Sequence, residues 1–118
     1  MILVIEDDPV TAAYLRGLLR DAGYQVDLAS TVAQAVKFFE AGIRPELVCL
    51  DLILPDGNGN DLIDWFETKG ITPPIIVLSA YIGSLHAEKA KRLPTLEKPI
   101  DATAFLALVQ EHAADRRE

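Results

Sequence analysis

Apolar residues form three short unbroken runs along the chain, at residues 2–5, 47–50 and 75–78. None of them alternates with polar residues, so we expect three strands that are buried on both faces of a sheet. Residues 25–29 do alternate, which predicts a half-exposed strand at a sheet edge. Residues 94–97 are expected to form a short last strand.

Between these runs, apolar residues recur three and four positions apart, the spacing of amphipathic helices. Asp8 before Pro9 predicts a helix start, with Asp as N-cap and Pro at the first helical position. Gly23 is expected to end this helix in the left-handed conformation. Its inward-facing residues are expected to be Val10, Tyr14, Leu18 and Ala22, widened by Leu15 and Leu19.

Three further helices and a short one are expected. The second is capped by Ser30 or Thr31 and runs through Ala41, and the third ends at Gly70. A short helix is expected over about residues 84–92, and Asp101 caps the last one. Strand and helix thus alternate five times, which requires a parallel α/β sheet with right-handed crossovers and helices on both faces.

The length of 118 residues predicts one domain, residues 1–118, with no room for a second, output domain; the sequence fits a protein that acts alone as well as a piece of a longer chain. A net charge of −7 argues against a direct nucleic-acid surface, which needs a basic patch. No apolar run is long enough to span a bilayer and no basic leader precedes the first run, so we expect a cytoplasmic protein without membrane contact. The single cysteine, Cys49, is expected to be a buried thiol.

Polar residues follow the expected buried strands directly: Glu6 and Asp7, then Asp51, then Ser79, and finally Lys98. Taken alone, each has an ordinary structural explanation, such as a capping acid or a surface lysine. Because parallel strands end at the same edge of a sheet, however, these side chains are expected to meet at a ligand-binding edge.

Carboxylates gathered at one edge repel one another, by roughly 4 kcal/mol per pair at about 4 Å and an effective dielectric near 20. Lys98 supplies one compensating charge, and hard carboxylate oxygens suit Mg²⁺. A metal, a lysine, a hydroxyl and a carboxylate nucleophile are the groups that phosphoryl transfer requires, and Asp51 would form an acyl phosphate.

Together these motifs resemble those of the response-regulator receiver domain, the phospho-acceptor of two-component signalling, from Met1 to the end of the chain. The matching segments are Glu6-Asp7, Asp51 with the Leu-Pro-Asp-Gly-Asn-Gly loop, Ser79-Ala80 and Lys98-Pro99. The resemblance implies a flavodoxin-like, doubly wound five-stranded parallel sheet of order 2-1-3-4-5. It also implies a cis Lys98–Pro99 peptide bond.

The family further implies the roles of the site residues. Asp51 would be the phosphorylation site, assisted by Ser79 and Lys98. Mg²⁺ would bind Asp7, Asp51 and the backbone carbonyl of Ile53, with Glu6 reaching it through water.

The function that the resemblance implies is a signalling switch in a two-component system or phosphorelay. A histidine kinase or histidine phosphotransfer protein would phosphorylate Asp51, and the aspartyl phosphate would change binding to a downstream protein target. The chain would catalyse only its own phosphorylation and slow dephosphorylation, and would not otherwise be an enzyme.

Two alternatives are open to the same residues. A haloacid-dehalogenase-like phosphatase carries a second Asp two positions after its nucleophile, where this chain has Ile53. A flavodoxin-like FMN protein needs a loop that accepts phosphate, whereas Glu6-Asp7-Asp8 would repel it.

The chain also departs from the common receiver pattern. Thr95 stands three residues before Lys98, where many members carry Tyr or Phe, and residues 91–94 lack the common Gly-Ala. His86 and His112 are expected on the surface rather than as phosphate carriers, and Asp56 is expected to shape its turn rather than bind metal.

Overall fold

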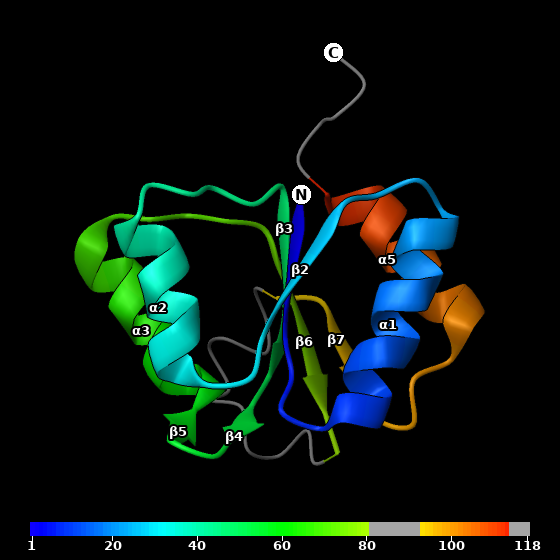
Figure 1. Ribbon diagram of the computed structural model, residues 1–118, viewed down its shortest axis with the longest axis horizontal. Coiled ribbons are helices and arrows are strands. Elements are labelled where there is room, and N and C mark those ends of the chain that lie inside the picture. The colour runs from blue at the N-terminus through cyan, green and yellow to red at the C-terminus, as the bar shows by residue number, and fades with distance from the viewer. Residues whose placement is uncertain (81–92, 114–118) are drawn as a thin grey trace.

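The computed structural model describes residues 1–80 and 93–113, which form a central sheet between two layers of helices (Figure 1). The predicted short helix at residues 84–92 lies outside the described residues. In this view the sheet is seen nearly edge-on, with one pair of helices on each side. Within the described ranges, no helix combines the length and apolar character needed to cross a membrane.

Five parallel strands make up the sheet in the order β2-β1-β3-β6-β7, the order of a flavodoxin-like fold, as predicted. Their bounds are Ile2–Ile5 for β1, Val26–Ala29 for β2, Leu47–Asp51 for β3, Ile75–Ser79 for β6 and Thr95–Glu97 for β7. Ile5 pairs with Leu50, Asp51 with Leu78 and Ser79 with Glu97. This register brings the carboxyl ends of the four strands β1, β3, β6 and β7 to one edge.

Two helices cover each face of the sheet (Figure 1). On one face lie α1 (Pro9–Asp21) and α5 (Ala102–His112), and on the other α2 (Val32–Glu40) and α3 (Gly59–Lys69). Each pair encloses its own apolar core, centred on Leu15 and Phe105 on one side and on Phe39 and Phe66 on the other. Strands β1, β3 and β6 are buried from both sides, which explains why their apolar runs are not interrupted by polar residues.

Cys49 is buried in the middle of β3, as expected. Burial raises the pKa of its thiol to about 12, because the thiolate would lose its hydration there. The thiol is therefore protonated at neutral pH and acts as a small apolar side chain.

The predicted buried face of α1 is confirmed at Leu15, Leu18 and Leu19 but wrong at Val10, Tyr14 and Ala22. Ala12, Leu15 and Leu19 point into the core, whereas Val10 and Tyr14 are 75% and 44% exposed. Two apolar stripes overlap on this helix, and spacing alone does not decide which one meets the sheet. Asp8 does cap the helix, because its Oδ2 accepts the Thr11 backbone N–H at 3.0 Å.

A small hairpin between β3 and α3 was not predicted. Its strands are β4 (Ile53–Leu54) and β5 (Gly57–Asn58), paired antiparallel with Ile53 opposite Asn58. Strands of two residues are too short to show an alternating pattern in the sequence. The hairpin directly follows Asp51, so it forms one wall of the edge where the polar residues meet.

Candidate functional site

Asp51 ends the central strand β3 and is buried, with its two carboxylate oxygens held by different groups. Oδ1 accepts the Ile53 backbone N–H at 3.1 Å, and Oδ2 accepts a hydrogen bond from Lys98 Nζ at 3.1 Å. The acid is thus fixed from one side by the hairpin and from the other by the segment after β7.

Glu6 is buried at the end of β1 and shares the same lysine. Its Oε1 accepts a hydrogen bond from Lys98 Nζ at 2.5 Å, and its Oε2 accepts the Asp8 backbone N–H at 3.2 Å. Burial raises the pKa of the Glu6 carboxyl from 4.5 to about 7; the nearby Asp51 adds to this rise, and Lys98 opposes it. Glu6 is therefore an acid that titrates near neutral pH.

Lys98 reaches the two acids because its backbone continues the pairing of β7 with β6. Its N–H donates to the Ser79 carbonyl at 2.8 Å, and the Lys98–Pro99 peptide bond is cis, as predicted. Burial alone would lower the pKa of the Lys98 ammonium, but its hydrogen bonds to Glu6 and Asp51 raise it above the ordinary value. Lys98 is a fixed cation between two carboxylates.

Three carboxylates converge as the sequence predicts. Glu6, Asp7 and Asp51 each offer one oxygen, and these atoms lie within 4.8 Å of one another. Asp7 is exposed, whereas the other two are buried, so the cluster opens to solvent on the Asp7 side. An all-oxygen donor set of this kind fits Mg²⁺, which binds few protein ligands and keeps several waters.

The remaining predicted residues are adjacent to this cluster along the chain or across the sheet. Ile53 contacts Asp51 through its backbone N–H, and the use of its carbonyl as a metal ligand stays a prediction. Ser79 is buried at the end of β6, one position beyond the residue that pairs with Asp51. A role for its hydroxyl likewise stays a prediction.

Gly59 allows the chain after the hairpin to return close to Asp51. Its N–H donates to the Leu52 carbonyl at 2.7 Å. A Cβ at this position would lie 2.7 Å from the Asp51 carbonyl oxygen and 2.9 Å from Leu52 Cα, both backbone atoms. The glycine in the sequence motif therefore serves close backbone packing beneath the site.

Two polar contacts of the hairpin were missed by the sequence analysis. Asn58 and Asp61 form a capping box at the start of α3, and their three-residue spacing was a readable signal. Asp56 accepts the backbone N–H groups of Val32 and Ala33, at 2.8 and 3.0 Å, from the start of α2. That contact spans more than twenty positions and has no local signal; it goes beyond the turn-shaping role expected of Asp56.

His112 is half-exposed near the end of α5, with its Nε2 3.8 Å from Glu111 Oε2. His86 lies outside the described residues.

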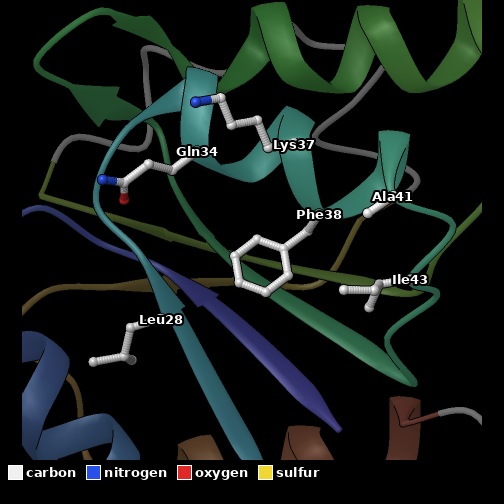
Figure 2. Close-up of a pocket in the computed structure, with 6 residues that line it drawn as sticks. All are labelled: Leu28, Gln34, Lys37, Phe38, Ala41 and Ile43. Atoms are coloured by element: carbon white, nitrogen blue, oxygen red, sulfur yellow. The ribbon is translucent and has the colours of Figure 1, made fainter.

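Two surface hollows differ in their position relative to the site. One of about 280 Å³ adjoins it, between α1 and the segment after β7. A larger one of about 490 Å³ lies elsewhere, between β2 and α2 (Figure 2). Its lining holds no carboxylate, so it lacks the metal ligands and the nucleophile of the acidic cluster. The residues that line it are Leu28, Gln34, Lys37, Phe38, Ala41 and Ile43.

A family model, curated relatives and solved structures all match this chain to the same family. Residues 2–110 match the family model described as the response regulator receiver domain. Protein Rrf1 of Nitratidesulfovibrio vulgaris is 38% identical over 114 residues, which cover 96% of this chain and 82% of that protein. The alkaline phosphatase synthesis transcriptional regulatory protein SphR of Synechococcus elongatus is 39% identical over 87 residues, 67% of this chain but only 34% of SphR.

Solved structures agree with the family match. A CheY-like response regulator receiver domain from Methylobacillus flagellatus superposes with a TM-score of 0.81 at 26% identity, covering 93% of this chain and 95% of the other. The response regulator TrrA of Thermotoga maritima, solved in complex with Mg(2+)-BeF, gives a TM-score of 0.82 at 26% identity, with 93% and 96% covered.

Proposed function

This chain belongs to the response regulator receiver domain family, and from that premise we propose that it is a phospho-acceptor switch with Asp51 as its acceptor. The observation that carries the proposal is the convergence on Asp51 of Lys98 and two further carboxylates, from strand ends far apart in the sequence. A buried carboxylate with a fixed cation beside it suits attack on an electrophilic phosphorus.

In the proposed reaction an Asp51 carboxylate oxygen forms a bond to phosphorus. The bond from phosphorus to the ring nitrogen of the donor's phosphohistidine breaks, and the released imidazole takes up a proton. Lys98, already 3.1 Å from Asp51 Oδ2, supplies positive charge beside the new aspartyl phosphate. Bound Mg²⁺ would offset the carboxylate charges and those of the phosphoryl oxygens.

The proposed role of the chain is to bind partners and not to turn over a substrate. Its own phosphorylation and slow dephosphorylation are the only reactions that we assign to it. A phosphatase of the haloacid-dehalogenase type would need a second catalytic carboxylate two residues after Asp51. That position is Ile53, whose side chain cannot protonate a leaving group.

The proposed partners are a histidine kinase or histidine phosphotransfer protein as donor and a downstream protein as target, both in the cytoplasm. Val10 and Tyr14 present exposed apolar surface beside the site, around the hollow that Lys98 and Pro99 also line. We place the donor on this surface, because a donor protein must cover the rim to bring its phosphohistidine to Asp51.

The consequence of phosphorylation is proposed only as a change in which protein is bound. SphR is named a transcriptional regulatory protein, and this chain spans about a third of its length.

Thr95 is half-buried in β7, and its hydroxyl donates to the Leu93 carbonyl at 3.2 Å. In many receivers an aromatic side chain at this position rotates when the domain is phosphorylated. Threonine has no ring, so in this chain the conformational change on phosphorylation must involve other residues.

The test is phosphorylation by a small donor. The protein is incubated with Mg²⁺ and acetyl phosphate, and its intact mass is measured. A single phosphoryl addition that hydroxylamine removes is expected for the wild type and for Asp27→Asn, a control on the exposed edge strand. Asp51→Asn should show none. Equal labelling of Asp51→Asn and the wild type would contradict the assignment.

A further inference from the structure

The hairpin after Asp51 is too short to hold its own shape. Each of its strands has two residues, and a lone two-stranded hairpin is marginal in water even at greater length. It nevertheless carries Ile53, whose N–H holds Asp51 Oδ1. The orientation of the Asp51 carboxylate therefore depends on whatever fixes the hairpin from outside.

The base of the hairpin is fixed by contacts close in sequence. Gly59 N–H donates to the Leu52 carbonyl at 2.7 Å. Asn58 accepts the Asn60 backbone N–H at 2.8 Å, while Asp61 accepts that of Asn58 at 3.1 Å. These bonds attach the returning strand to α3, but they do not reach the turn at Pro55 and Asp56.

The turn is fixed by Asp56 against a different helix. Its Oδ1 accepts the Val32 N–H at 2.8 Å, and its Oδ2 accepts the Ala33 N–H at 3.0 Å. These are the first two residues of α2, where backbone N–H groups lack partners within the helix and attract negative charge. The two N–H groups also lower the pKa of the Asp56 carboxyl, so it is ionised at neutral pH.

The same helix start has a second cap that does not touch the hairpin. Thr31 Oγ1 accepts the Gln34 N–H at 3.0 Å from within α2's own first turn. The two caps thus do similar work for α2, but of the two only Asp56 joins that helix to the segment after Asp51, where Val32 also packs against the core that contains Leu54. Removing the Thr31 cap should therefore affect the stability of α2 alone, whereas removing the Asp56 cap should also affect the position of the hairpin.

We propose that Asp56 is a positioning residue of the acceptor site: by binding the start of α2 it fixes the hairpin, and the hairpin fixes the Ile53 backbone against Asp51. Its effect on Mg²⁺ binding rests on the proposed function, in which the Ile53 carbonyl is a metal ligand. Its effect on the Ile53 N–H does not, because that group donates to Asp51 Oδ1 and the hydrogen bond does not involve the Ile53 carbonyl.

The experiment compares Asp56→Ala, Asp56→Asn and the matched control Thr31→Ala, each in the full chain and below its melting temperature. Hydrogen exchange at the Ile53 amide is measured by NMR without metal, and Mg²⁺ affinity by titration. Asp56→Ala should speed Ile53 exchange and weaken Mg²⁺ binding by about tenfold, the scale known for groups that orient metal ligands. Asp56→Asn keeps one acceptor oxygen and should fall between Asp56→Ala and the wild type.

Thr31→Ala should lower the melting temperature while leaving both readouts at wild-type values. The inference fails if Asp56→Ala leaves Ile53 exchange unchanged, or if Thr31→Ala changes it as much, because the effect would then be general loosening of α2. If Asp56→Ala does not fold, Asp56→Asn decides by the same criteria. A wild type that gives the expected exchange pattern but takes no phosphoryl group would leave the positioning role standing and remove the phospho-acceptor function.

Discussion

Lys98 Nζ lies 2.5 Å from Glu6 Oε1, although the two residues are 92 positions apart in the sequence. The same ammonium contacts Asp51 Oδ2, so one cation serves two carboxylates at the ends of different strands. Glu6 has the more buried side chain of the two acids, and a buried charge costs free energy unless it is paired. The stability of the metal-free protein is therefore linked to the protonation of Glu6.

The first prediction concerns pH. Folding raises the pKa of Glu6 from 4.5 to about 7, so the folded protein binds its proton more tightly than the unfolded chain. Between these pH values, each increase in pH favours the unfolded state. In EDTA, the free energy of unfolding should fall between pH 5.5 and pH 8 by on the order of 2 kcal/mol, measured by urea denaturation.

Glu6→Gln is the control, because it removes the titrating group from its contacts with Lys98, Asp51 and the Asp8 backbone. Its stability should be nearly constant over the same range. The lowered pKa values of Asp8 and Asp56 act below their ordinary value of 3.8 and do not enter this window. An equal slope in Glu6→Gln and the wild type would assign the effect to another group.

The second prediction concerns the cation itself. Lys98→Met leaves Glu6 and Asp51 facing each other without a positive charge, so it should destabilise the metal-free protein at pH 8 by about 1–3 kcal/mol. Lys98 is partly exposed, which keeps this below the loss for a fully buried pair. Excess Mg²⁺ should recover most of the loss, because it replaces the missing charge. Lys69→Met, at an exposed position in α3, should show neither effect in the same denaturation series.

The strand ends of the site were predictable because their signals are local. An unbroken apolar run that stops at an acid, as at Asp51, gives the strand and its end together, and the parallel topology then brings the ends into contact. The pair Asp8-Pro9 gave the start of α1 for the same reason, since N-cap chemistry involves only neighbouring residues.

The contacts that were not predicted depend on tertiary packing. Which of two apolar stripes α1 buries is decided by its docking on the sheet, which leaves Tyr14 at the surface donating to the Ile100 carbonyl at 3.3 Å. The bond from Asp56 to Val32 depends on how α2 and the hairpin come together. The residue types of the site can be read from local sequence patterns, whereas the contacts that support them arise from tertiary packing.

The third prediction tests the close packing under Asp51. A Cβ in Gly59→Ala would meet the Asp51 carbonyl oxygen at 2.7 Å, so the backbone of β3 or of the hairpin must shift. This should destabilise the protein by about 1–3 kcal/mol and slow phosphorylation by acetyl phosphate. Gly17→Ala in α1 is the matched control, because in the described part of the chain a Cβ there would have no atom within 4 Å beyond its chain neighbours and its own helix backbone. It should stabilise the protein by about 0.5–1 kcal/mol, as expected in a helix interior, and leave the phosphorylation rate unchanged.

The last prediction concerns the lifetime of the aspartyl phosphate. Hydrolysis needs a water in line with the bond from Asp51 to phosphorus, and a polar side chain beside the site can orient that water. Ile53 contacts Asp51 through its backbone and its side chain is 58% exposed, so it stands at the mouth of the site with no hydrogen-bonding group. Its stiff β-branched side chain should screen the phosphoryl group, and self-dephosphorylation should be slow.

Ile53→Asn should therefore speed the decay by about tenfold, a small part of what positioned proton-transfer groups achieve. Because the side chain is exposed, the change should alter stability little. Ile43→Asn is the control: this isoleucine is also exposed, at 39%, but lines the hollow between β2 and α2 (Figure 2). The decay of purified phosphoprotein is followed by intact mass after acetyl phosphate is removed. If both variants decay at the wild-type rate, or if the wild type loses its phosphoryl group within seconds, screening by Ile53 does not set the lifetime.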